Sequence, residues 1–152
     1  MLKISTGEET LRFLQDSAGI GNDDIVLEIG CGIGRVGKVA APLCRKWIGC
    51  DVASKMLSLT AERLKDLSNV ELVEISGYNL SGSADASVDV VYCTVVFMHL
   101  EPWDRYNYVL EAFRVLRLKV GFMSTTSTFA RMAAEECLKR IVRCRPQIVR
   151  PI

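Results

Sequence analysis

A run of aliphatic residues over 25–29, Ile-Val-Leu-Glu-Ile, passes directly into the segment 30–34, Gly-Cys-Gly-Ile-Gly. Glycines lack side chains and permit backbone conformations that other residues avoid, so we expect the chain to leave the strand in a tight turn. A helical stretch is expected from Arg35 onward. A buried strand, a glycine turn and a helix in this order predict an α/β fold, with the turn at the carboxyl end of a parallel strand.

Apolar runs and helix signals continue to alternate after this turn. They predict a doubly wound, mostly parallel sheet of about five strands with helices on both faces. The other strands are expected over residues 47–50, 70–75, 88–96 and 118–123, and the helices over 7–18, 35–44, 54–67, 102–117 and 130–142. Thr6 with Glu9 has the spacing of a capping box, and Ser54 is the expected cap of the third helix.

Length and composition fit one domain over residues 1–152, because 49% hydrophobic and 24% charged side chains are typical of a globular chain. A formal net charge of +1 gives no overall attraction to nucleic acid or to an anionic membrane. We recognise neither an apolar run long enough to span a bilayer nor a secretory signal. The six cysteines lack C-x-x-C spacing, so we expect free thiols, no metal site and a cytoplasmic location.

The charge is unevenly distributed along the chain. Residues 1–118 contain 12 Lys and Arg against 16 Asp and Glu, a net charge of −4, whereas residues 119–152 contain 7 against 2, a net charge of +5. The last segment is therefore an atypical basic extension of the domain. Its basic patch of Lys139, Arg140, Arg143, Arg145 and Arg150 has no interleaved aromatic side chains, so binding of nucleic acid is not expected.

The glycine segment and Asp51 together predict a pocket for an adenosine-containing ligand. Bare backbone can approach a ligand closely, and the N-terminus of the following helix favours a carboxylate or a phosphate. Asp51 follows the second expected strand, where its carboxylate can accept two hydrogen bonds from the hydroxyls of a ribose.

Two classes of ligand compete for this pocket. Residues 32–37 match the G-x-G-x-x-G pattern of dinucleotide-binding proteins. That register begins two residues after the strand has ended at Gly30, and Gly37 lies only 14 residues before Asp51, where about 20 is usual. An NAD-dependent oxidoreductase is therefore the weaker alternative.

The segment 26–34 resembles motif I of the class I S-adenosylmethionine-dependent methyltransferases, in which an acidic residue precedes Gly-x-Gly-x-Gly. Residues 48–57, 88–94 and 111–117 resemble the second motif, the fourth strand and the helix before the fifth strand of that family. The resemblance covers residues 20–118. It implies a Rossmann-like fold and S-adenosyl-L-methionine as the cofactor.

The resemblance also implies roles for individual residues. The methionine part of the cofactor would be lined by backbone of Gly30, Cys31, Gly32 and Gly34. Glu28 would lie near its amino group, and Asp51 would hold the ribose hydroxyls. Val52 and Met56 would pack near the adenine, and Thr94 is a candidate to face the cofactor.

The chain departs from the family pattern after the third strand. The family commonly has an acidic residue there that accepts a hydrogen bond from the adenine amino group, whereas this sequence reads Ser76-Gly77-Tyr78. The Ser76 hydroxyl is a weaker acceptor than a carboxylate, so backbone of Gly77 or Tyr78 is expected to substitute for it. Tyr78 is also expected to touch the adenine or to cover the pocket.

A second departure lies at the end of the chain. The family's sheet finishes with two antiparallel strands, and roughly 30 residues after position 118 are too few for a helix and this hairpin. We therefore expect a sheet without the antiparallel hairpin, in a chain truncated or shifted in reading frame after about residue 118. An exposed sheet edge can pair with another chain, so self-association is expected.

The sequence thus predicts methyl transfer from S-adenosyl-L-methionine to an unidentified, small-molecule acceptor. The cofactor carries the reactive group, so the protein has to align the acceptor and needs no metal ion. His99, the only histidine, is a candidate substrate contact or base, and the alternative is a structural histidine that caps the next helix. No catalytic residue is otherwise indicated, and a non-catalytic cofactor-binding remnant of the fold is the alternative function.

Overall fold

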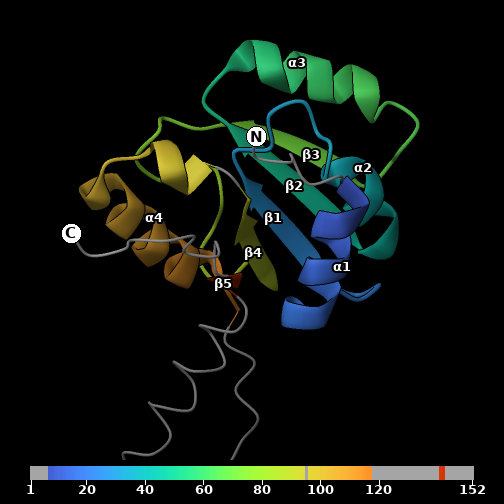
Figure 1. Cartoon of the computed structure of the whole chain (residues 1–152), viewed down its shortest axis with the longest axis horizontal. Coiled ribbons are helices and arrows are strands. Elements are labelled where there is room, and N and C mark those ends of the chain that lie inside the picture. Colours follow the sequence, from blue (N-terminus) through green and yellow to red (C-terminus); the bar gives the residue numbers. More distant parts are fainter. Residues whose placement is uncertain (1–6, 95, 118–140, 143–152) are drawn as a thin grey trace, which may run out of the picture.

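One parallel sheet organises the chain. Its strands are β1 (Ile25–Ile29), β2 (Lys46–Asp51), β3 (Val70–Glu74), β4 (Val90–Cys93) and β5 (Ile141–Val142). They are hydrogen-bonded in the order β3-β2-β1-β4-β5 (Figure 1). This computed structural model describes residues 7–94, 96–117 and 141–142. The chain moves outward from β1 to β3 and then returns to the other side of β1, which confirms the predicted doubly wound fold.

Helices lie on both faces of the sheet (Figure 1). The helical segments are α1 (Gly7–Ala18), α2 (Gly37–Ala40), the 3-10 helix η1 (Ala41–Leu43), α3 (Ser54–Arg63), the 3-10 helix η2 (Val96–His99) and α4 (Pro102–Val115). On one face, Leu14 of α1 and Leu57 of α3 pack in the core that contains Trp47. On the other face, Tyr108 and Val115 of α4 pack in a second core.

Side chains of each central strand divide between these two cores. Val26 of β1 belongs to the core under α1–α3, and its neighbour Leu27 belongs to the core under α4. This alternation follows from the strand geometry, in which successive side chains point to opposite faces. Because all the strands run parallel, their carboxyl ends lie along one edge of the sheet and bring the predicted site segments together.

Several expected boundaries differ from the structure. The helix predicted over 35–44 is divided into α2 and η1, where Pro42 occupies the first turn of η1. The strand predicted over 88–96 is confined to β4, because the chain turns into η2 at Val96. The N-cap of α3 is Ala53 instead of Ser54, and no side chain caps it. The expected capping residue Thr6 lies outside the described residues.

The fifth strand comes from a different part of the chain than expected. Ile141 and Val142 pair with Val91 and Tyr92 of β4, although a helix was predicted over 130–142. Two adjacent β-branched residues favour extended backbone, and tertiary pairing with β4 outweighs the helical pattern around them. The strand predicted over 118–123 lies outside the described residues. Just before it, Leu116 forms an isolated parallel bridge with Val88.

Gly49→Ala should destabilise the fold. A Cβ at Gly49 would lie 2.4 Å from the fully buried ring of Trp47, and overpacking of this kind lowers the free energy of unfolding by about 1–3 kcal/mol. Gly21→Ala is the matched control, because its Cβ would meet only Asp24 at 3.7 Å. Urea unfolding of both variants measures the difference. Equal stabilities of the two variants would contradict this packing.

Candidate functional site

The turn after β1 is anchored to the end of β2. The backbone N–H groups of Gly30 and Cys31 both donate to the carbonyl of Cys50, at 2.8 and 2.9 Å. The turn then closes on itself, because Gly34 N–H donates to the Cys31 carbonyl at 2.9 Å. The glycine segment is therefore a fixed backbone structure at the carboxyl edge of the sheet, as predicted from its position after the strand.

Asp51 joins the two loops that follow β1 and β2. Its Oδ2 accepts a hydrogen bond from Gly32 N–H at 2.8 Å, and its Oδ1 accepts one from Ala53 N–H at 2.9 Å. Each carboxylate oxygen has two lone-pair sites, so the group keeps capacity for two further donors. The half-buried carboxylate thus fits the predicted role toward a ribose diol while it also shapes the site.

Gly32 presents bare backbone to open space. Its φ is +55°, in the left-handed region that glycine adopts without strain, and a Cβ placed there would meet nothing within 4 Å. The Thr60 hydroxyl of α3 donates to the Gly32 carbonyl at 2.7 Å and so fixes this peptide. Gly30 differs, because a Cβ there would lie 1.9 Å from Val96. The start of η2 therefore packs directly on the turn.

Glu28 lies beneath this turn in a buried hydrogen-bond chain. The Trp47 Nε1–H donates to the Tyr92 hydroxyl at 3.0 Å, and this hydroxyl donates to Glu28 Oε2 at 2.7 Å. The Glu28 residue is 2% exposed. Burial raises the pKa of its carboxyl from 4.5 to about 8, against the opposing effects of the Tyr92 hydrogen bond and the nearby Arg35 charge. Glu28 is therefore mostly protonated at pH 7.

The cysteines near the turn are not reactive thiols. Burial is the main cause that raises the pKa of Cys31 and of Cys50 to about 12, and the negative charge of Glu28 contributes at both positions. A thiol with so high a pKa stays protonated and is a poor nucleophile. The backbone N–H of Cys31, which the sequence analysis expected to line the cofactor, donates to the Cys50 carbonyl. A contribution of Cys31 to ligand binding stays a prediction.

The residues expected around an adenine surround the ends of β2 and β3. Val52 is 57% exposed directly after β2, and Met56 is half-buried in the first turn of α3. A Cβ on Gly77 would lie 3.6 Å from Val52 Cγ1, so the segment after β3 passes beside this side chain. Tyr78 is 64% exposed and adjoins the same segment. These positions suit a flat apolar group held between the two loops.

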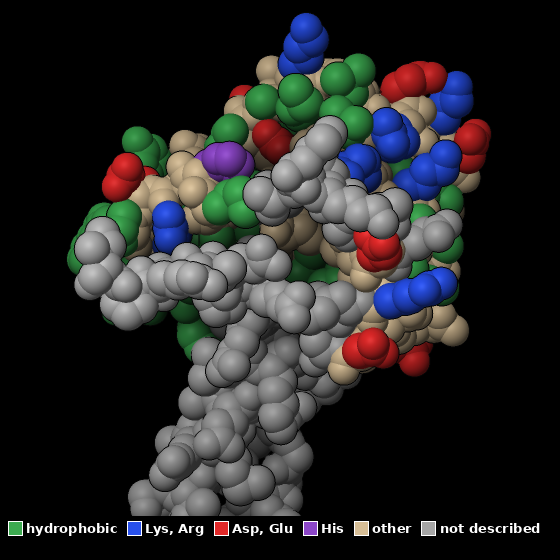
Figure 2. Space-filling model, in the orientation of Figure 1, with side chains coloured by type: hydrophobic (Ala, Val, Ile, Leu, Met, Phe, Trp, Pro, Cys, Tyr) green, Lys and Arg blue, Asp and Glu red, His purple; other side chains and the backbone are tan. Residues whose placement is uncertain are grey.

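The end of β4 carries the remaining candidates. Thr94 is half-buried directly after the strand, and His99 is exposed at the end of η2. On α4, the rings of Trp103 and Tyr106 lie 5.7 Å apart, and both are exposed. Figure 2 shows hydrophobic, acidic and basic side chains mixed over the upper part of the molecule, where α3 lies, and over the uncovered part of the α4 region.

Three groups of functional interest were not predicted. Thr60 supports the turn, Tyr92 and Trp47 hold Glu28, and Glu111 with Arg114 fixes the segment after β3. A signal existed for Thr60, a polar residue in the apolar stripe that Leu57 and Leu64 define at helical spacing. The others depend on partners far away in the sequence.

Within the described part of the chain, no group of three or more acidic, cysteine or histidine side chains is arranged to hold a metal ion. None of the helices in the described ranges has the length and apolar character needed to cross a membrane.

A doubly wound sheet with a glycine turn after β1 and a carboxylate at the end of β2 defines a nucleotide-binding domain of the Rossmann type. Comparison with known families makes this more specific, because the family described as methyltransferase domain matches residues 26–119. The match covers more than half of the chain. The chain therefore belongs to the methyltransferase domain family, and the fold and family expected from the sequence are confirmed.

Individual relatives agree with this family. A probable S-adenosylmethionine-dependent methyltransferase of Mycolicibacterium smegmatis is 36% identical over 103 residues, which is 66% of this chain and 37% of that protein. The human thiol S-methyltransferase TMT1A is 32% identical over 137 residues, which is 88% of this chain and 52% of that protein. The chain thus spans about half or less of these relatives.

A solved structure gives the same result. The phosphoethanolamine N-methyltransferase 1 of Haemonchus contortus, in complex with phosphoethanolamine and S-adenosylhomocysteine, superposes with a TM-score of 0.63. It is 25% identical, and the match covers 69% of this chain and 22% of that chain.

Glu28→Gln should remove a pH dependence of stability. Because the folded pKa is about 8 and the unfolded value is 4.5, the folded protein keeps a proton that the unfolded chain has lost between these values. Wild-type stability should therefore fall as the pH rises from 5 to 8, by at most about 1.4 kcal/mol per pH unit from this group. The glutamine does not titrate and can still accept from Tyr92.

Denaturant unfolding of wild type and variant at each pH measures this effect. Between pH 5 and 8, the free energy of unfolding of the variant should rise steadily relative to that of the wild type. A constant difference in stability over this range would show that Glu28 titrates normally in the folded protein.

Proposed function

We propose that this chain binds S-adenosyl-L-methionine at the carboxyl edge of its sheet and transfers the methyl group to a small-molecule acceptor. The observation that carries the proposal is the joint placement of Gly32 and Asp51. Bare backbone at Gly32 faces open space, and the carboxylate of Asp51 lies 2.8 Å from the Gly32 nitrogen. One ligand with an amino-acid end and a ribose can therefore contact both.

The residues present fit this cofactor. Backbone over 30–34 would line the methionine part, and Asp51 would accept from the ribose hydroxyls. Val52 and Met56 would pack against the adenine, whose edge would meet Ser76, Gly77 and Tyr78. Thr94 would face the cofactor from the end of β4. These assignments remain proposals that rest on position in the fold.

Glu28 would act toward the cofactor's ammonium group, either directly or through water. In the absence of the cofactor, burial keeps its carboxyl mostly neutral at pH 7, and a nearby positive charge would favour the ionised form. Binding of the cationic cofactor would then release a proton from Glu28. The Tyr92 hydroxyl, which donates to Oε2, would stabilise the carboxylate that forms.

When bound, the cofactor supplies an electrophilic methyl group on a sulfonium. The residues of this chain would contribute by orienting that group, since alignment of two reacting groups can provide roughly 7–11 kcal/mol of a barrier. His99 is the candidate base or substrate contact, because it lies exposed beyond the end of β4. No other side chain is assigned to proton transfer.

The acceptor is proposed only as a small molecule. The relatives named above act on different atoms by their names, a thiol sulfur and an amine nitrogen. The acceptor atom therefore cannot be taken from them. A cytoplasmic location and self-association through the sheet edge also remain predictions, as does the non-catalytic alternative.

Calorimetry with S-adenosylhomocysteine and with NAD tests the proposal on the full chain. S-adenosylhomocysteine should bind and NAD should not, and the reverse result would favour an oxidoreductase. Asp51→Asn keeps an acceptor for Gly32 N–H but loses the charge. It should weaken S-adenosylhomocysteine by about tenfold to a hundredfold, the typical loss of charged hydrogen bonds.

Asp66→Ala is the control for this variant, because Asp66 is exposed beyond the end of α3. It should leave the affinity unchanged. An unaltered affinity of Asp51→Asn would contradict the ribose role. Transfer of a radioactive methyl group to a panel of small thiols and amines then separates an enzyme from a non-catalytic binding module.

A further inference from the structure

The segment between β3 and β4 carries the residues proposed to meet the adenine, yet it has little regular structure. Residues 75–89 contain no helix, and the isolated bridge at Val88 is their one strand-like pairing. At the near end, Ile75 N–H donates to the Asp51 carbonyl at 3.0 Å. At the far end, backbone N–H groups of residues 86–88 donate to the carbonyls of Arg114 and Val115. Between these two ends, side chains from another element bind the backbone of the segment.

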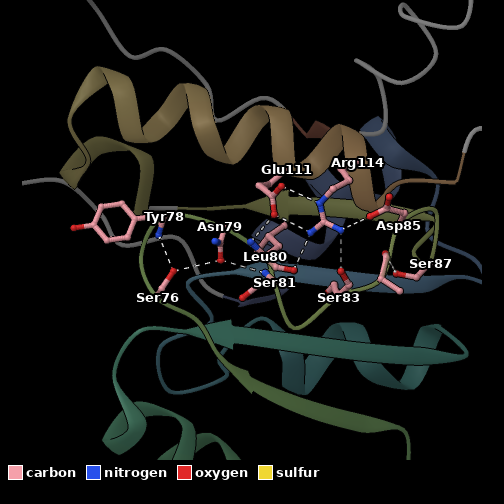
Figure 3. Close-up of polar contacts among 11 residues, drawn as sticks. Ser76, Tyr78, Asn79, Leu80, Ser81, Ser83, Asp85, Ser87, Glu111 and Arg114 are labelled. Atoms are coloured by element: carbon pink, nitrogen blue, oxygen red, sulfur yellow. Dashed lines mark hydrogen bonds and ion pairs between the residues drawn. The ribbon is translucent and has the colours of Figure 1, made fainter.

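Two side chains of α4 form these contacts. Glu111 Oε2 accepts from Leu80 N–H at 2.8 Å, and Arg114 Nη2 donates to the Leu80 carbonyl at 3.0 Å. Arg114 Nη1 donates to the Ser83 carbonyl at 3.0 Å. Three backbone groups of the segment are thus held by one acidic and one basic side chain (Figure 3).

The two side chains also hold each other. Arg114 Nε and Nη2 donate to the two carboxylate oxygens of Glu111 at 2.9 and 2.8 Å, and Nη1 forms an ion pair with Asp85 at 2.5 Å. The hydrogen bonds from Arg114 lower the pKa of Glu111, and those to Glu111 and Asp85 raise the pKa of Arg114. The forked geometry requires a guanidinium, because the ammonium of lysine cannot form these parallel bonds.

Further hydrogen bonds connect Leu80 with the residues proposed to meet the adenine. Leu80 is fully buried in the core under α4, so its backbone is a fixed point. Its neighbour Asn79 accepts through Oδ1 from Ser81 N–H at 3.2 Å and from the Ser76 hydroxyl at 3.3 Å. Ser76 Oγ in turn accepts from Tyr78 N–H at 3.4 Å. The chain of contacts in Figure 3 therefore leads from Arg114 to the polar atoms around Gly77.

We propose that Glu111 and Arg114 are positioning residues for recognition of the base. They fix residues 76–78 beside Val52, where the polar groups of that segment contact the edge of the adenine. Glu111 and Arg114 do not touch the adenine. The inference rests on the proposed function, in which this segment meets the adenine. It assigns to the end of α4 a part in cofactor selectivity, although α4 packs on the opposite face of the sheet from α3.

The test compares two ligands and two arginines. S-adenosylhomocysteine and S-inosylhomocysteine differ at the 6-position of the base, which is an amino group in one and an oxo group in the other. The wild type should prefer the adenine compound by about tenfold, the worth of one hydrogen bond. Arg114→Ala should weaken S-adenosylhomocysteine by a similar factor and bring the ratio of the two affinities close to one.

Arg117→Ala is the matched control. Arg117 follows the same helix and ties the same segment, through the Ala86 carbonyl at 3.1 Å and Asp89 at 3.2 Å. Those contacts lie at the β4 end of the segment, far along the chain from Ser76. The control should lower the melting temperature without changing the ratio of affinities. Arg114→Lys, which keeps the charge, should show the same loss of discrimination and serves if Arg114→Ala does not fold.

The outcomes separate the two hypotheses. A wild type that does not bind S-adenosylhomocysteine contradicts the proposed function itself. A wild type that binds both ligands equally, an Arg114 variant that keeps the wild-type ratio, or an Arg117 variant that loses it to the same extent each overturns the positioning role.

Discussion

The carboxyl end of β2 is the feature on which the site depends. The Cys50 carbonyl accepts two N–H groups from the turn after β1, and the Asp51 carboxylate accepts a third from Gly32. These bonds replace the side-chain packing that a glycine segment cannot provide. The same carboxylate faces the region where a ribose is proposed, so the group that shapes the turn is also the group that would read the ligand. Loss of the charge on Asp51 should therefore weaken both the turn after β1 and the binding of the ribose.

A second dependence connects the core to the turn. Glu28 lies in β1 between Gly49 of β2 and Tyr92 of β4, and it is buried. Burial destabilises the ionised form of a carboxyl group, so Glu28 is mostly neutral at pH 7 until a bound cation stabilises its charge. Trp47 and Tyr92 hold it in one orientation. The same burial that stabilises the fold therefore sets the charge state of a predicted cofactor contact.

The sequence predicted the parts of this protein that local patterns specify. The glycine segment after an apolar strand located the turn, and the alternation of strands and helices indicated a parallel, doubly wound sheet, although not the order of its strands. It did not predict the hydrogen bonds of Glu111 and Arg114 with Leu80 or the role of Tyr92. Leu80 and Glu111 lie 31 positions apart in the sequence, and Glu28 and Tyr92 lie 64 apart. β5 was missed because the helical pattern before Ile141 was read through to Val142, whereas pairing with β4 decides the conformation there.

The account is tested most directly by the structure of the full chain in crystals soaked with S-adenosylhomocysteine. It predicts the amino-acid end of the ligand over the Gly32 backbone, both ribose hydroxyls on Asp51 and the base beside Val52. Bound ligand at any other part of the sheet, or a ribose turned away from Asp51, would contradict it.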